Sequence, residues 1–191
     1  MTDLQKLLRR IADSLNAAQA HYQIWFTLRG DGKALPDYYD EMDDYRYVDF
    51  FEASNAGHYK LMYIELGCLF DSDTRAASIR NLKEKLKKLG RSDLVSKIEN
   101  ELAPFTQLVS NIIVIRGKLI AHKEIGADSK DVHAAFSVVP DRICDLIGKS
   151  CTLIDSIHKE LFGQSESIAF ETDRFEKATF ELLNVLRRGR S

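Results

Sequence analysis

Residues 111–124 read NIIVIRGKLIAHKE, an apolar run that leads into a group of charged and titratable side chains. Arg116 and His122 stand six residues apart in this stretch, with Lys118 and Lys123 beside them. The rest of the chain shows the apolar periodicity of a helical scaffold. We therefore expect this stretch to form the core helix and to carry any chemistry that the chain performs.

The spacing of Arg116 and His122 sets a geometric condition on a shared site. On a straight α-helix, six residues advance roughly 600° and about 9 Å, so the two side chains lie roughly 120° apart around the axis. For both to reach one phosphate, Arg116 must use its full length, the helix must end near Ile120, or a second copy of the chain must complete the site. Gly117 weakens the helix and permits a local distortion. A two-fold dimer meeting along this helix end would place two Arg–His pairs in one cleft.

An arginine and a histidine in one cleft suit the cleavage of RNA without a metal ion. A histidine near its ordinary pKa takes a proton from a ribose 2′-hydroxyl or donates one to the leaving 5′-oxygen. An arginine fork holds the non-bridging phosphate oxygens and stabilises the charge of the transition state. DNA lacks the 2′-hydroxyl and would not be cut in this way. The residues alone also allow a structural role, in which Arg116 pairs with a carboxylate and His122 caps a helix end.

On both sides of this stretch, apolar residues recur at steps of three and four, which is the pattern of amphipathic helices. Few turn dipeptides interrupt the pattern, so we predict an all-α protein. The helix that contains the stretch, Phe105–His122, is apolar around most of its girth and is expected to be the central, most buried one. The other predicted helices are Thr2–Leu28, Val48–Phe70, Arg75–Leu89, Asp93–Leu102, Val132–Val138, Asp141–Phe162 and Ala169–Arg188.

Short polar segments separate the predicted helices. Thr2 or Asp3 is expected to cap the first helix, and Gly90 is expected to end the helix Arg75–Leu89. The segment Asp71–Thr74 is expected to break the chain and restart a helix with N-capping side chains, although its two aspartates also allow a poor metal site. The loop Lys33–Tyr47 is acidic, which suits either a solvated connection or a patch for a basic partner.

Two further features concern charge. The most basic stretch of the chain contains Arg80, Lys83, Lys85, Lys87, Lys88 and Arg91. Such a run indicates either a solvated helix face or a surface that contacts RNA phosphates, because neighbouring cations release counterions from a polyanion. His21 and His58 are isolated on helical faces, and we expect them to be core or boundary residues rather than ligands.

Length, composition and net charge limit the class of protein. The 191 residues are 45% hydrophobic, which suffices for one sizeable core, so we predict a single domain covering residues 1–191. The net charge of −2 favours no partner. Cys68, Cys144 and Cys151 show no metal-ligand spacing and indicate thiols in a reducing compartment. We find neither a signal peptide nor an apolar window of about 20 residues, and expect a cytoplasmic protein without membrane contact, metal or cofactor.

The segment Arg116-Gly-Lys-Leu-Ile-Ala-His122-Lys-Glu124 resembles the Arg-x4-6-His signature of the HEPN superfamily. It is most similar to the abortive-infection, AbiU-like branch, whose helix reads Arg-Asn-Lys-hydrophobic-hydrophobic-Ala-His-Arg-Asp. Lys118, Ala121 and His122 match that pattern, and Lys123 and Glu124 replace its last two residues conservatively. Upstream, the resemblance extends to Leu69-Phe70-Asp71, followed by Ser78, Leu82 and Leu86.

The resemblance implies an antiparallel four-helix core with extra N- and C-terminal helices, assembled as a homodimer. It further implies a metal-independent endoribonuclease, or an inactive relative, that serves in phage defence or as the toxin of a toxin–antitoxin pair. Arg116 would stabilise the phosphate and His122 would be the acid–base residue, with Lys118, Lys123 and Glu124 contacting the substrate. Gly117 departs from the pattern, since active members carry a polar residue there, often asparagine.

Three hypotheses follow. The first is a dimeric ribonuclease whose cleft is made by Arg116 and His122 of both copies, with RNA as substrate and an antitoxin protein as a further partner. The second is a non-catalytic helical module that binds a nucleotide, RNA or a partner protein, which the glycine at position 117 supports. The third is a structural or regulatory helical protein that works through its acidic loop. Whether the chain is an enzyme is left open by the residues alone.

Overall fold

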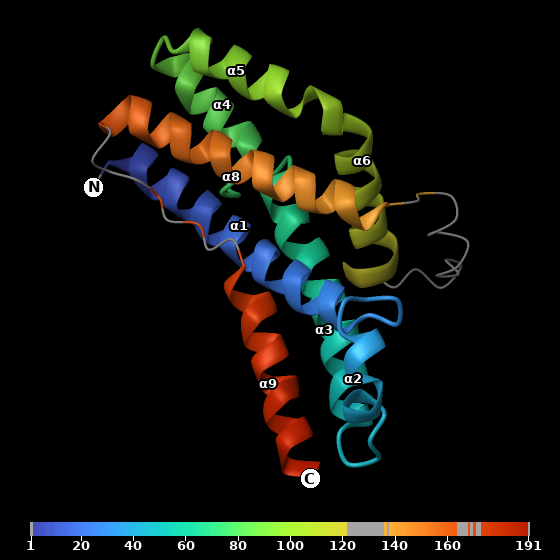
Figure 1. Ribbon diagram of the computed structural model, residues 1–191. Coiled ribbons are helices and arrows are strands. Elements are labelled where there is room, and N and C mark those ends of the chain that lie inside the picture. Colours follow the sequence, from blue (N-terminus) through green and yellow to red (C-terminus); the bar gives the residue numbers. More distant parts are fainter. Residues whose placement is uncertain are drawn as a thin grey trace. The chain divides into compact units, whose positions relative to one another are not determined.

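The computed structural model of the chain describes residues 2–121, 136, 138–163, 168, 170 and 173–190. Within these residues every regular element is a helix, which confirms the predicted all-α fold class (Figure 1). The α-helices are α1 (Asp3–Leu28), α2 (Leu35–Met42), α3 (Val48–Leu69), α4 (Ile79–Lys88), α5 (Ser92–Leu102), α6 (Thr106–Ile115), α8 (Pro140–Phe162) and α9 (Arg174–Arg190). A 3₁₀ turn, η1 (Ala103–Phe105), precedes α6, and a π-helical turn, η2 (Arg116–Ala121), follows it.

The chain folds as two compact units. Met1–Ala18 and Tyr63–Phe170 form unit 1, whereas Gln19–Met62 and Glu171–Ser191 form unit 2. The single domain over residues 1–191 stays a prediction. Most of the expected helix at Val132–Val138 lies outside the described residues.

The start of α1 in unit 1 is fixed by a reciprocal pair of hydrogen bonds. The backbone N–H of Thr2 donates to Gln5 Oε1 at 2.8 Å, and the N–H of Gln5 donates to Thr2 Oγ1 at 3.2 Å. This arrangement is a capping box, which satisfies two N–H groups that have no partner inside the helix. Thr2 therefore caps the helix, as one of the two predicted caps.

Helices α4 and α5 form an antiparallel hairpin around Gly90. This glycine has a φ of 72°, and the N–H of the next residue, Arg91, donates to the carbonyl of Leu86 at 3.0 Å. Such a left-handed residue with a bond back to the last turn is the usual glycine C-cap, which confirms the predicted role of Gly90. Lys83 on α4 and Glu99 on α5 pair across the hairpin at 2.9 Å.

Helix α8 runs antiparallel to α5. Arg91, at the start of α5, pairs with Glu160 near the end of α8, whereas Glu101 near the end of α5 pairs with Lys149 earlier in α8. The pairs therefore progress in opposite directions along the two helices. The apolar face of α8 is buried, and its buried side chains are Ile143, Leu146, Ile147, Ser150, Cys151, Leu153, Ile154, Ile157 and His158.

The connection from α3 to α4 differs from the prediction. Helix α4 begins at Ile79 with Ser78 as its N-cap, and the Ser78 hydroxyl accepts a hydrogen bond from the N–H of Asn81 at 3.4 Å. No helix restarts at Asp71–Thr74, because the carboxylates there accept hydrogen bonds inside the turn instead. Asp71 accepts from the N–H of Asp73, and Asp73 accepts from the N–H of Arg75, both over two residues.

The helix that follows Pro104 also differs from the prediction. Helix α6 ends at Ile115 instead of continuing to His122, and its α-helical pattern gives way to the π-turn. In α6 the buried side chains are Ile112 and Ile115, while Ile113 is 40% exposed. The expectation of a central, most buried helix was therefore wrong for α6, because its apolar girth is only partly covered in unit 1.

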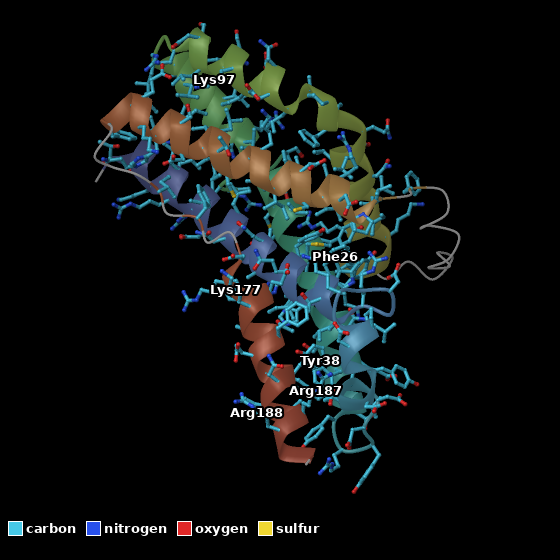
Figure 2. All side chains as sticks on the ribbon, viewed as in Figure 1. Phe26, Tyr38, Lys97, Lys177, Arg187 and Arg188 are labelled. Carbon is cyan, nitrogen blue, oxygen red and sulfur yellow. The ribbon has the colours of Figure 1, made fainter. Side chains whose placement is uncertain are left out.

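Unit 2 contains a helix where a loop was expected. Helix α2 lies inside the acidic segment Lys33–Tyr47, with Pro36 in its first turn and a kink at Tyr38. It forms because it packs against α9: Tyr38 donates a hydrogen bond to Asn184 at 2.7 Å, and Arg187 stacks over the Tyr38 ring at 4.1 Å (Figure 2). These contacts surround a small apolar cluster of buried residues, Leu28, Ala34, Phe51 and Leu183.

The remaining helices lie close to their predicted positions. Helices α1, α3 and α8 are within one or two residues of the predicted bounds, whereas α9 begins later than expected, at Arg174. Across the described ranges, each helix is too short or too polar to cross a membrane.

Candidate functional site

The candidate site is organised by the change from α-helix to π-helix at Arg116. The backbone N–H of Arg116 still donates to the carbonyls of Ile112 and Ile113, and the residues that follow adopt the wider π-turn. In a π-turn each hydrogen bond spans five residues, and such turns are frequent at functional sites. Gly117 lies inside this turn, where a glycine resists distortion least. The local distortion predicted as one solution of the spacing problem is therefore present.

Arg116 extends from the start of the π-turn across the surface of α3. A Cβ built on Gly67 would lie 2.9 Å from Nε and 3.3 Å from Cγ of Arg116, which is closer than side-chain atoms normally approach. The stem of the arginine therefore lies directly on the bare backbone of Gly67. Only glycine leaves this path open, so Gly67 determines where the guanidinium is held.

The guanidinium reaches a carboxylate at the end of this path. Arg116 Nη1 lies 3.4 Å from Asp71 Oδ2, and the two side chains are 29% and 27% exposed. Asp71 is itself oriented, because its other oxygen, Oδ1, accepts from the N–H of Asp73 at 2.9 Å. One oxygen thus holds the turn and the other faces the arginine. The contact is therefore the arginine–carboxylate pair that the sequence allowed as a structural role for Arg116.

The pKa of the Cys68 thiol depends on the charges of Arg116 and Asp71. Burial raises the pKa of its thiol, and the negative charges of Glu65 and Asp71 raise it further, while the positive charge of Arg116 opposes them. Both members of the Arg116–Asp71 pair therefore shift the pKa of this thiol. A raised pKa leaves less of the reactive thiolate at neutral pH than an ordinary cysteine has.

The other predicted site residues divide into two groups. Lys118 lies in the π-turn with a half-buried side chain. His122, Lys123 and Glu124 fall outside the described residues, so the distance between Arg116 and His122 stays a prediction. The angle expected for a straight helix no longer applies between them, because residues 116–121 are π-helical.

Two residues of the site were not singled out from sequence. Gly67 was missed because a lone glycine in an amphipathic helix gives only the weak signal of a close approach by another group. Asp71 was considered as a cap or metal ligand and not as the partner of Arg116. Two separate sequence segments carry the resemblance to the HEPN family, one around Leu69-Phe70-Asp71 and one beginning at Arg116. The ion pair between Asp71 and Arg116 brings these two segments together in the structure.

The described chain is thus an all-helical protein with an arginine at a distorted helix end facing an acidic turn. The model of the HEPN AbiU2 family matches residues 1–178, so the chain belongs to this family, as the resemblance indicated. No curated protein and no solved structure matches the chain.

Proposed function

We propose that the chain is a metal-independent endoribonuclease that acts as a homodimer on RNA in the cytoplasm. Arg116 stabilises the phosphate and His122 transfers protons. The observation that carries the proposal is the placement of Arg116 at a π-helical turn, across Gly67 and against Asp71, in a chain that belongs to a HEPN family.

The proposed reaction needs only groups that the chain supplies. A histidine accepts the proton of a ribose 2′-hydroxyl, the 2′-oxygen attacks the adjacent phosphorus, and the bond to the 5′-oxygen breaks as that oxygen gains a proton. The products carry a 2′,3′-cyclic phosphate and a 5′-hydroxyl. Two copies of His122 in a dimer cleft would supply both the base and the acid.

Asp71 suits the role of a positioning residue in this reaction. It faces Nη1 of Arg116, while Nε and Nη2 make no hydrogen bond to the rest of the described chain. A guanidinium offers five N–H donors, so the remaining ones are available to phosphate oxygens. The carboxylate thus orients the arginine without occupying all of its donors.

The decisive experiment measures cleavage of a fluorescently labelled RNA in EDTA by the wild-type chain and by His122→Ala and Arg116→Ala. The wild type should cleave, and loss of the acid–base histidine should lower the rate by about 10²–10⁴-fold. A substrate with 2′-deoxyribose at every position should stay intact. Undiminished cleavage by a folded His122→Ala protein would refute the proposed mechanism.

A non-catalytic module that binds RNA or a partner protein, such as an antitoxin in a phage-defence system, is the second candidate. The glycine at position 117 favours it, since active relatives carry a polar residue there. A Cβ at position 117 meets no atom within 4 Å, so a side chain can begin there without a clash. Gly117→Asn restores the polar residue common in active relatives. If neither wild type nor Gly117→Asn cleaves the RNA that it binds, the binding module is the better description.

A further inference from the structure

The basic run of α4 is not one uniform surface. Lys83 pairs with Glu99, Lys87 pairs with Glu84, and Arg91 pairs with both Asp93 and Glu160. Arg80 donates to the carbonyl of Ser72 at 2.8 Å. These contacts satisfy most of the run inside unit 1. Lys85 and Lys88 differ from these residues, because neither contacts a carboxylate or a carbonyl through its side chain in the described part of the chain, and of the two it is Lys85 that lines a hollow.

Lys85 faces a hollow of about 260 Å³ that lies within unit 1. The N-terminal turns of α1, the segment from Thr74 to Ala77, and Asn81 and Lys85 on α4 line this hollow. Four of its lining residues are cationic, Lys6, Arg10, Arg75 and Lys85, whereas Asp3 is the lining carboxylate.

The charge of the hollow is largely uncompensated. Arg75 is neutralised by Asp73, at 2.7 Å. Lys6, Arg10 and Lys85 have no carboxylate partner among the residues that the structure describes. Three cations from two separate helices therefore face one small space, which favours an anion inside it.

We propose that this hollow binds phosphate groups of the RNA backbone, a proposal that rests on the proposed ribonuclease function. A single-stranded backbone fits better than a free nucleotide because no aromatic residue lines the hollow to stack a base. The amide of Asn81, which also lines it, is already bonded to the carbonyls of Asp73 and Ala76. The hollow thus offers charge without base recognition, which is the character of a positioning contact.

The hollow also lies close to the candidate site along the chain. Asp71 pairs with Arg116, and Thr74 lines the hollow three residues later in the same turn. Three residues span at most about 11 Å between Cα atoms. One RNA strand of a few nucleotides can therefore contact both places, with the hollow holding phosphates beside the one that Arg116 would face.

The test compares two variants of equal charge. Arg10→Gln/Lys85→Gln removes two cations of the hollow, and Arg9→Gln/Lys88→Gln removes their exposed neighbours on the same two helices. Both carry the His122→Ala change, so that the RNA stays uncut. The probe is a fluorescein-labelled oligouridylate of about 12 nucleotides. Its dissociation constant is measured by anisotropy between about 50 and 200 mM KCl.

The hollow variant should bind RNA about tenfold more weakly at low salt, and the slope of log K against log[KCl] should fall by about 1.4, or 0.7 for each lost contact. The control variant should keep the wild-type affinity within about twofold. Equal losses in both variants would show a diffuse charge effect and overturn the proposal, as would no loss in either. Thermal unfolding of all three proteins checks that the fold is retained.

A second arm separates the RNA strand from smaller anions. Saturable binding of uridine monophosphate or inorganic phosphate that disappears in Arg10→Gln/Lys85→Gln would assign the hollow to a small ligand and overturn the RNA proposal. The outcome is independent of catalysis, since binding is measured without cleavage. A chain that cleaves RNA while the hollow variant binds normally refutes this site and leaves the proposed function standing.

Discussion

Arg116 crosses α3 at Gly67, where a Cβ would lie only 2.9 Å from the arginine Nε. The contact ties a residue of the π-turn to a helix nearly fifty positions earlier in the chain. It leads the guanidinium to Asp71, four residues beyond that glycine. The position of the arginine therefore depends on the absence of one side chain.

Gly67→Ala should displace Arg116 and leave the fold intact. The atoms in the way belong to a flexible side chain, and alanine favours the helix by up to about 1 kcal/mol over glycine. If the chain is a ribonuclease, misplacement of the arginine should lower cleavage by about 10- to 100-fold. Gly57→Ala is the matched control on the same helix, because a Cβ there meets nothing within 4 Å. Equal activities of the two variants would contradict a positional role for Gly67.

The thiol of Cys68 should report the Arg116–Asp71 pair directly. Arg116→Gln removes a cation that lowers the pKa of Cys68, so the thiol should be alkylated a few-fold more slowly at pH 8. Asp71→Asn removes an anion that raises this pKa, so alkylation should become faster. The measurement uses a Cys144→Ser background, since Cys144 is exposed, and burial raises the pKa of Cys151 to about 12. Alkylation rates equal to that of the parent protein in both variants would contradict the contact of this charged pair with Cys68.

His21 and His58 in unit 2 should make stability depend on pH. They were expected to be isolated, but their Nδ1 atoms lie 2.8 Å apart, so one ring donates and the other accepts. Burial lowers the pKa of both rings below 6.5, and the charge of His21 lowers that of His58 further. The unfolded chain therefore binds protons first as the pH falls, and stability is lost below about pH 6.5.

Urea unfolding between pH 5 and 8 tests this histidine pair. The free energy of unfolding of the wild type should decrease toward pH 5, whereas His21→Gln should reduce that decrease because one of the two titrating rings is gone. A variant that loses stability as steeply as the wild type would assign the pH dependence to other groups.

Arg187 should anchor α9 to α2. Its side chain stacks on Tyr38 and pairs at 3.2 Å with Glu41, whose side chain is only 7% exposed. Arg187→Ala should lower the free energy of unfolding by more than the control variant does, an effect limited by the exposure of the arginine. Figure 2 shows Arg188 on the side of α9 away from Tyr38, so Arg188→Ala is the control and should cost less than about 0.5 kcal/mol.

Adding Glu41→Gln separates the charge from the packing in this contact. Removing Arg187 leaves the buried carboxylate of Glu41 without its cation. If this unpaired charge causes most of the lost stability, the double variant should recover part of it in chemical denaturation. No recovery would assign the loss to the stacking of Arg187 on Tyr38.

The sequence alone determined the helical class, the bounds of α1, α3 and α8 and the turn at Gly90. These features depend on apolar periodicity and on the backbone freedom of one residue, both of which are local properties. The segment beginning at Arg116 was also found from sequence, because its charged residues interrupt an apolar run. Periodicity identified neither α2 nor the N-cap of α4, since packing against α9 and hydrogen bonds within the Asp71–Asp73 turn decide them.

Only the tertiary structure decided what surrounds Arg116. The partner Asp71 and the bare backbone at Gly67 lie more than forty residues away in sequence, and no local pattern specifies which helix faces meet. For the same reason, the sequence does not distinguish Lys85 from Lys83 and Lys87. In the structure, Lys83 and Lys87 each pair with a glutamate, whereas Lys85 does not. Ion pairs and close approaches depend on distances through space, and these are set only when the helices pack.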